Sequence, residues 1–339
     1  MMGSRVAELF SEIDKFRAQL LQNVEVMTEC QHVETEICHK EILTRIENVI
    51  LGVVTSLSKD EAPVLALPNR SSWANVRDIY YNNTQLFGSQ KTVDGIVDDI
   101  SSMLKVPRRS LHVLATSKGL ISGDLCYLEE DGTRIDCHSS SAAVAVSSNI
   151  GGIRNIVSSA KFVLIVEKDA TFQRLLDDDF CAKLCPCIII TGKGVPDVNS
   201  RLMVRKLWDT LHIPIFALVD ADPHGIEIMC IYKYGSVAMS FEAHSLTVPS
   251  VMWLGLLPSD LQRLRVPDAA LIPLTKRDKS KLDSLLKRPY LASQPDWQKE
   301  MELMQQSKVK AEIQSLAAIA PDFLTNIYLP NKLRYGGWV

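Results

Sequence analysis

The sequence has no long apolar run and few cysteines for its length. No uninterrupted apolar run approaches the ~18 to 20 residues that a membrane-spanning helix needs, which argues against a membrane protein. Eight cysteines in 339 residues are too few for a disulfide scaffold, so we expect a reducing, intracellular compartment. The N-terminal segment is charged where a signal peptide would have its apolar core, and we therefore expect no such leader.

The sequence also lacks an excess of positive charge. It has 37 Lys and Arg against 40 Asp and Glu, a net charge of -3. Because most nucleic-acid-binding proteins are basic, this balance taken alone argues weakly against a nucleic-acid partner. The content of 46% hydrophobic and 23% charged residues is typical of globular proteins. The length predicts two domains, with an additional terminal segment.

Changes in pattern divide the chain into three regions, which we place at residues 1–62, 63–150 and 151–339. In the first region apolar residues recur at helical spacing until prolines interrupt the chain. These helices either pack on the core or form a docking arm for a partner protein. We find no internal repeat and no low-complexity tract.

The middle region has the element order of a winged-helix DNA-binding domain. Thr92 can cap a first helix. The apolar face expected for that helix consists of Val93, Ile96, Val97, Ile100 and Leu104. Pro107 suits the first turn of a second short element. Residues 120–137 then predict a hairpin with Asp131-Gly132 as its turn. In winged-helix domains a helix enters the major groove and the hairpin touches the backbone.

The third region predicts a parallel α/β sheet. Three short, nearly continuous apolar runs lie at residues 161–167, 186–192 and 213–220, separated by segments of helical periodicity. Alternating strands and helices are typical of a parallel sheet that is buried on both faces. The fold class is therefore α+β for the first domain and α/β for the second.

Three acidic residues follow strands of this predicted sheet. Glu167 ends the first strand, and Asp220 and Asp222 end the third. Ligands bind parallel α/β sheets at the carboxyl ends of the strands, so we expect these side chains at one edge. Three unpaired carboxylates in one place repel one another, and Mg²⁺ relieves that repulsion. The alternative is that each acid is an ordinary loop or N-cap residue.

A pair of tyrosines, Tyr80 and Tyr81, follows Arg77 in the middle region. A tyrosine is usually a packing residue with a polar tip, but beside a cation and a metal-bound phosphate its hydroxyl can act as a covalent nucleophile. Four basic residues would give this region phosphate affinity, unless they only form a solvated surface. These residues are Arg77, Arg108, Arg109 and Lys118.

Three weaker signals have ordinary explanations. Cys181, Cys185 and Cys187 lack the spacing of a zinc site, which favours buried thiols. His224 is either a contact to the site or a turn residue. The segment 276–288 carries a local charge of +4, which suits a DNA-facing surface and a solvated helix equally well.

Six motifs in one order resemble a known family, the meiotic DNA double-strand-break transesterases, which are eukaryotic relatives of the topoisomerase VI A subunit. The resemblance runs from Val76 to Val339. The motifs are VRDIYYNNTQLFG, PRRSLHVLATSKGLISG, LIVEKDATF, ITGKGVPD, LVDADPHGIEI and LGLLPSDL. The resemblance implies a winged-helix-like domain with the catalytic tyrosine, followed by a Toprim domain with a Rossmann-like parallel sheet.

The resemblance also implies roles for individual residues. Tyr81 matches the nucleophile that becomes joined to the DNA 5′ end, whereas Tyr80 matches a packing position. Arg77 matches the basic residue one turn earlier. Lys118, in the SKGL motif, matches a DNA contact. The acidic Mg²⁺ site of the Toprim domain corresponds to Glu167, Asp220 and Asp222.

The family further implies a nuclear enzyme that cleaves double-stranded DNA as a homodimer, together with a B-type topoisomerase VI-like subunit docked on the N-terminal segment. This sequence departs from the pattern, because Val76 follows Trp73 almost at once where relatives have several dozen residues. We therefore expect the first part of the winged-helix domain to be missing. Two alternatives are a Toprim nuclease or primase-like enzyme without tyrosine chemistry, and a non-catalytic isoform that binds DNA or partner proteins.

Overall fold

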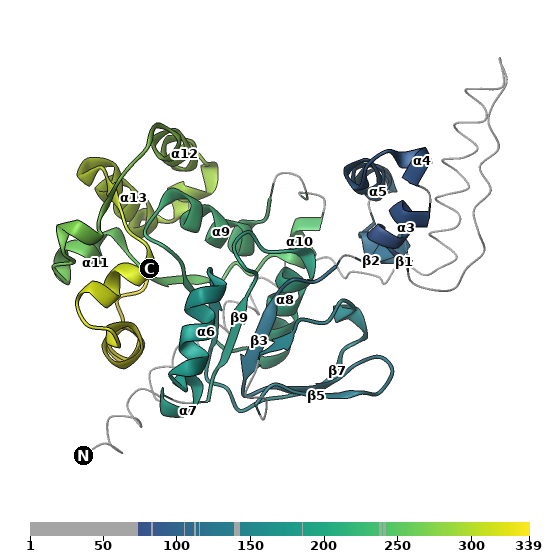
Figure 1. Cartoon of the computed structure of the whole chain (residues 1–339), viewed down its shortest axis with the longest axis horizontal. Coiled ribbons are helices and arrows are strands. Elements are labelled where there is room, and N and C mark those ends of the chain that lie inside the picture. Colours follow the sequence, from purple (N-terminus) through teal and green to yellow (C-terminus); the bar gives the residue numbers. More distant parts are fainter. Residues whose placement is uncertain are drawn as a thin grey trace. The chain divides into compact units, whose positions relative to one another are not determined.

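The computed structural model describes two compact units of the chain (Figure 1). The described residues are 74–82, 84–104, 106–111, 113–114, 116–138, 143–184, 186–236, 239 and 242–339. The larger unit includes Ser117–Val339, and the described part of the smaller one ends at Thr116. The expected docking segment, residues 1–62, lies outside the described residues, so its role stays a prediction.

The smaller unit is built around one helix. Its elements are β1 (Ala74–Asn75), α3 (Val76–Asn82), α4 (Thr84–Phe87), α5 (Gln90–Leu104), the 3-10 helix η1 (Arg108–Leu111) and β2 (Val113–Leu114). The two short strands pair in parallel. Buried Val93 and Val97 of α5 form the centre of the core. Four partly buried residues pack against them: Ile79, Tyr80, Phe87 and Val113.

Helix α5 differs from the expectation in two ways. It begins at Gln90, before Thr92, because the Ser89 hydroxyl accepts a hydrogen bond from the Thr92 backbone N–H at 3.2 Å. The expected cap at Thr92 is therefore wrong. Of the expected apolar face, Ile96 and Ile100 are exposed, as is Met103 one turn further on. Part of the apolar surface of α5 thus stays in contact with water.

The larger unit contains a six-stranded sheet of order β11-β10-β8-β9-β3-β6. Strands β11, β10, β8 and β9 are parallel, whereas β3 pairs antiparallel with β9, and β6 antiparallel with β3. The three predicted strands are confirmed as β8, β9 and β10. The strand bounds are β3 (Leu120–Gly123), β6 (Val144–Ala145), β8 (Val163–Val166), β9 (Ile188–Thr191), β10 (Ile215–Leu218) and β11 (Met252–Gly255).

Helices cover both faces of this sheet (Figure 1). Strands β8, β9 and β10 are fully buried, and alternate residues of each point to opposite faces. Leu164 and Val166 pack with α6 (Asp169–Asp177) and α7 (Phe180–Leu184). Val163 and Ile165 belong to the core that includes α8 (Val198–Leu211) and α9 (Pro223–Tyr234). This two-sided burial explains the continuous apolar runs of the sequence.

The predicted hairpin is only partly confirmed. Strands β4 (Cys126–Leu128) and β5 (Arg134–Asp136) form a hairpin around Asp131-Gly132, and β7 (Arg154–Val157) completes a three-stranded sheet. Leu120–Gly123, expected in the same hairpin, instead pairs with β9 in the large sheet. Consequently the compact units divide after Thr116, whereas the sequence pattern predicted a boundary at 150.

A helical extension follows β11 and returns to the sheet. Its C-terminal Val339 exchanges two backbone hydrogen bonds with Trp253 of β11. No helix among the described residues is long and apolar enough to cross a membrane. The remaining elements are η2 (Ile150–Gly152), α10 (Ala243–Leu246), α11 (Pro258–Arg263), η4 (Asp268–Ala270), β12 (Ile272–Pro273), α12 (Lys276–Leu286), η5 (Pro289–Ser293), α13 (Pro295–Ser307), β13 (Val309–Lys310), η6 (Ile313–Ala318), the π-helix η7 (Leu324–Tyr328) and α14 (Leu329–Tyr335).

Candidate active site

Helix α3 gives its two tyrosines different environments. Tyr80 packs against the small core around Val93 and Val97, whereas Tyr81 is 67% exposed. The two rings are tilted, with centroids 5.4 Å apart. Arg77 is also exposed and lies four residues before Tyr81, so both side chains emerge from the same side of the helix. A hydroxyl and a guanidinium are thus presented together to solvent.

The three other basic residues predicted to bind DNA differ in their contacts. Arg108 donates to the Asp98 carboxylate of α5 at 2.7 Å and 2.5 Å, so part of its role is to hold η1 against α5. Arg109 is exposed. Lys118 lies in the larger unit, where its ammonium donates to the backbone oxygen of Lys193 at 3.2 Å.

The acidic residues lie where the parallel strands end. The backbone N–H of Asp220 donates to Glu167 Oε2 at 2.8 Å, which joins the residues that follow β10 and β8. Glu167 is 7% exposed and Asp220 is 4% exposed. Asp222 is the N-cap of α9, and its Oδ1 accepts from the Gly225 N–H at 2.6 Å. Asp220 Oδ1 accepts from the Ile313 N–H at 2.8 Å, so each of these carboxylates is held by at least one backbone N–H group.

Two lysines supply positive charge beside these acids. The Lys168 ammonium lies 2.7 Å from Asp220 Oδ2 and 3.2 Å from Glu312 Oε1. The Lys310 ammonium lies 3.9 Å from Asp222 Oδ2. Sequence reasoning missed both lysines, although Lys168 directly follows Glu167. Their role depends on distances that only the folded chain fixes.

Burial and mutual repulsion perturb the acids. The pKa of Glu167 is raised to about 7, first by burial and then by repulsion from the Asp220 and Asp222 carboxylates, while the Asp220 N–H and Lys168 oppose the shift. Burial also raises the pKa of Asp220, against the opposing effect of Lys168. The carboxylate oxygens of buried Glu167 and Asp220, with half-buried Asp222 nearby, are of the kind that a hard divalent cation binds.

The acidic residues suit a metal ion by the chemistry of their oxygen donors and not by a preformed arrangement. In the part of the chain that the structure describes, no three His, Cys, Asp or Glu side chains are already arranged to hold a metal ion. The Asp220 carboxylate is paired with Lys168, and one oxygen of Asp222 is used in capping α9. A divalent cation would therefore compete with Lys168 for Asp220.

Gly225 is a further residue of the site that sequence reasoning missed. A Cβ atom at this position would lie 2.7 Å from the Asp220 backbone oxygen and 2.9 Å from Glu167 Oε2. Only glycine therefore allows α9 to approach the acids this closely. The signal in the sequence was the glycine three residues after Asp222, where the first turn of a capped helix lies against the strand ends.

The weaker signals of the sequence lie elsewhere. Within α12, Lys281 pairs with Glu227 of α9, as does Arg288 just beyond the helix. Cys187 is buried, and Cys185 lies outside the described residues. The His224 Nε2 atom lies 3.6 Å from Asp278 Oδ1.

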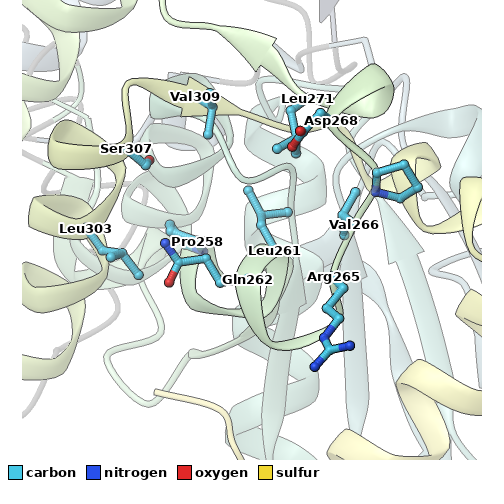
Figure 2. A pocket seen from close by; sticks show the side chains of 11 residues that line it. Pro258, Leu261, Gln262, Arg265, Val266, Asp268, Leu271, Leu303, Ser307 and Val309 are labelled. Carbon is cyan, nitrogen blue, oxygen red and sulfur yellow. The ribbon is translucent and has the colours of Figure 1, made fainter.

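A hollow in the larger unit contains none of the predicted site residues (Figure 2). It is lined by Pro258, Leu261, Gln262, Arg265, Val266, Pro267, Asp268, Leu271, Leu303, Ser307 and Val309.

A parallel sheet with acids at its carboxyl edge and a separate exposed tyrosine are features of a topoisomerase-like enzyme, and comparison with known proteins agrees. The family model for the Toprim domain of Spo11 and of the topoisomerase 6 A subunit matches residues 162–333. A second model, Type IIB DNA topoisomerase, matches residues 68–113. Toprim domains are generally metal-binding.

Individual relatives extend this result. The chain is 58% identical to human meiotic recombination protein SPO11, over 88% of this chain and 89% of the human protein. It is 52% identical to the mouse protein of the same name, over 98% of both chains. The A subunit of DNA topoisomerase 6 from Arabidopsis thaliana is 38% identical over 81% of this chain and 65% of its own. The chain belongs to the family of Spo11 and the topoisomerase 6 A subunit, which are topoisomerase-related DNA-cleaving enzymes.

The perturbed Glu167 predicts a pH-dependent stability. Because its folded pKa of about 7 lies above the ordinary value of 4.5, the folded state binds more protons between these values. In metal-free protein this carboxylate therefore lowers the free energy of unfolding as pH rises from 4.5 to 7, by about 3 kcal/mol. Glu167→Gln should be more stable than the unmodified chain at pH 8 but not at pH 5, measured by urea unfolding in EDTA.

Adding Mg²⁺ provides the control for this prediction. At pH 8 the ion should raise the melting temperature of the unmodified chain more than that of Glu167→Gln. A stability difference that stays constant between pH 5 and pH 8 would contradict the titration of Glu167.

Gly225→Ala should destabilise the larger unit. The added methyl group must displace the Asp220 backbone or the Glu167 carboxylate, and overpacking of this kind costs about 1 to 3 kcal/mol. Gly95→Ala is the matched control, because a Cβ there meets nothing within 4 Å and the change should instead stabilise α5 by about 1 kcal/mol. Urea unfolding of both variants tests the pair, and equal stability of Gly225→Ala and the unmodified chain would contradict the close approach.

Proposed function

We propose that this chain makes the DNA double-strand breaks that initiate meiotic recombination, using Tyr81 as the nucleophile. The observation that carries the proposal is the division of roles in α3, where Tyr80 is packed and Tyr81 is exposed beside Arg77. The names of the human and mouse relatives, meiotic recombination protein SPO11, support the biological context. Such an activity belongs in the nucleus.

The reaction is a transesterification. The Tyr81 hydroxyl oxygen attacks a backbone phosphorus, the bond between phosphorus and the 3′ oxygen breaks, and the protein becomes joined to the DNA 5′ end. Tyr81 loses its hydroxyl proton, and the departing 3′ oxygen gains a proton and becomes a hydroxyl group. Arg77 stabilises negative charge on the phosphate oxygens. A phosphoester is conserved, so cleavage itself needs no nucleotide hydrolysis.

The acidic residues of the larger unit supply the metal site of this proposal. Glu167, Asp220 and Asp222 would hold Mg²⁺, which when bound offsets charge on the non-bridging and leaving oxygens. Lys168 pairs with Asp220, and a bound cation would compete with it for this carboxylate. Glu167 and Asp220 are suitable oxygen donors, because burial has already removed much of the water around their carboxylates.

Cutting both strands requires two such reactions. We infer a homodimer in which the Tyr81 of one protomer works with the acids of its partner, so that a two-fold axis relates two cleavage sites on double-stranded DNA. A B-type topoisomerase VI-like subunit completes the assembly. The exposed basic residues Arg109 and Lys118 contact the DNA backbone, together with the Arg108 that also pairs with Asp98.

A specific observation favours a second candidate, a non-catalytic isoform that binds DNA or partner proteins. The alignment with the mouse protein spans 387 positions, whereas this chain has 339 residues, so several dozen positions have no counterpart here. The exposed Ile96, Ile100 and Met103 of α5 agree with a smaller unit that lacks part of its packing surface. This candidate predicts DNA binding without any covalent adduct.

Replacing each tyrosine by phenylalanine tests the nucleophile. Tyr81→Phe should abolish DNA-linked protein, because no hydroxyl remains to attack the phosphorus. Tyr80→Phe is the matched control, and it should retain adduct formation since a phenyl ring fills the same packing position. The measurement is denaturing immunoprecipitation of labelled DNA with the complete chain and its B-type partner.

Each result separates the candidates. Equal adduct formation by Tyr81→Phe and the unmodified chain would refute the assignment of Tyr81. Free DNA ends without any adduct would indicate a Toprim nuclease, and DNA binding without cleavage would indicate the non-catalytic isoform.

The amphipathic N-terminal segment gives a separate prediction about the B-type subunit. Deleting Val6–Leu57 should abolish co-purification of this subunit, because the apolar helix faces expected there would no longer be available to it. A pull-down from co-expressing cells measures this. The Glu167→Gln variant serves as a control that should still bind, and undiminished binding by the deletion variant would refute the docking role.

A further inference from the structure

One carboxylate, that of Asp197, joins the start of β3 to the start of α8. Its Oδ1 accepts a hydrogen bond from the Ser200 N–H at 2.7 Å, which caps α8. Its Oδ2 accepts one from the Lys118 backbone N–H at 2.9 Å. The two oxygens therefore perform two separable functions, one within a helix and one toward a segment that is distant in sequence.

The loop that carries Asp197 is itself bonded to the acidic site. The Gly194 N–H donates to the Glu167 backbone oxygen at 2.8 Å, and the Lys118 ammonium donates to the Lys193 backbone oxygen at 3.2 Å. A short series of hydrogen bonds therefore connects Lys118, through residues 193 and 194, with the backbone of Glu167. An exposed ammonium is held on the loop that borders the buried acids.

The neighbouring glycine leaves this segment little freedom. A Cβ atom on Gly119 would clash with Ser200 Oγ and lie 3.0 Å from the Thr191 backbone oxygen. The backbone of residues 118 and 119 is therefore packed directly onto the beginning of α8 and the end of β9. Such contacts fix the place from which the Lys118 side chain emerges.

We propose that Asp197 is a positioning residue that fixes the Lys118 ammonium beside the acidic edge so that it binds a DNA backbone phosphate. This rests on the proposed function, in which Lys118 contacts DNA. An ammonium has three N–H donors, and the bond to Lys193 uses one of them. Holding the backbone of Lys118 in place reduces the conformational entropy that its side chain loses when it meets the phosphate.

The chemistry of asparagine separates the two functions of Asp197. In Asp197→Asn the side-chain oxygen can still cap α8, since Asn and Asp are comparable N-caps. The amide NH₂ then faces the Lys118 N–H, so the second hydrogen bond is lost. Asp124→Asn is a matched control at the opposite end of β3, because Asp124 Oδ2 similarly accepts from the Ser159 N–H at 2.7 Å.

Two measurements on the complete chain test the proposal. Hydrogen exchange of the peptide containing Lys118 should accelerate in Asp197→Asn and not in Asp124→Asn. The dependence of duplex DNA affinity on salt, measured in EDTA to prevent cleavage, should become shallower by about 0.9 in log–log slope, the value for one phosphate contact. Lys118→Ala should have the same effect, and the double variant should match either single variant.

The possible results are distinct. If Asp197→Asn exchanges faster at Lys118 but its salt dependence of DNA affinity is unchanged, the positioning role is overturned. A reduced salt dependence in Lys118→Ala would in that case leave the proposed function intact. An unchanged slope in Lys118→Ala would overturn this proposal, and Tyr81-dependent adduct formation then tests the proposed function by itself. If Asp197→Asn fails to fold, Asp197→Ser keeps a capping hydroxyl and is interpreted in the same way.

Discussion

The hydrogen bond from the Asp220 backbone to the Glu167 carboxylate is the contact on which the acidic site depends. It exists because β8 and β10 are neighbouring parallel strands, with Val166 opposite Leu218. Both strands therefore end at the same edge of the sheet. The arrangement buries the Glu167 carboxylate and places it close to other negative charges, so that burial first and repulsion second raise the pKa of Glu167. Lys168 and Lys310 offset part of this repulsion, and a divalent cation would offset more.

The sheet could be predicted wherever its physical cause is local in the sequence. Strands buried on both faces must be apolar at nearly every position, so β8, β9 and β10 were found with nearly correct bounds. Strand β3 was assigned to the hairpin instead, because Leu120–Gly123 resembles any short apolar strand. Its partner, β9, lies far along the chain, and only tertiary pairing decides between the two assignments.

The residues of the site divide in the same way, into those indicated by the local sequence and those whose role depends on tertiary contacts. The closeness of Glu167 and Asp220 could be predicted from their positions at strand ends, whereas the role of Tyr81 rests on its motif and stays a prediction. Lys168 and Gly225 were missed, because a neighbour across the fold gives each its role. The charge argument against nucleic acid was wrong, since the chain belongs to a family of DNA-cleaving enzymes. Whole-chain charge counts buried acids such as Asp220 equally with the exposed lysines that DNA would meet.

The acidic site and Tyr81 differ in how much buried structure supports them. The acids belong to a unit with extensive cores on both faces of a sheet, so their geometry is held by many buried side chains. The buried centre of the core below Tyr81 is two valines of α5 with a few partly buried neighbours. Small cores bury a smaller fraction of their apolar surface and are correspondingly less stable. The placement of Tyr81 therefore depends on whether Ile79 and Tyr80 keep α3 packed on α5. Additional packing on α5 from another segment or protein would stabilise the position of Tyr81 without touching its side chain.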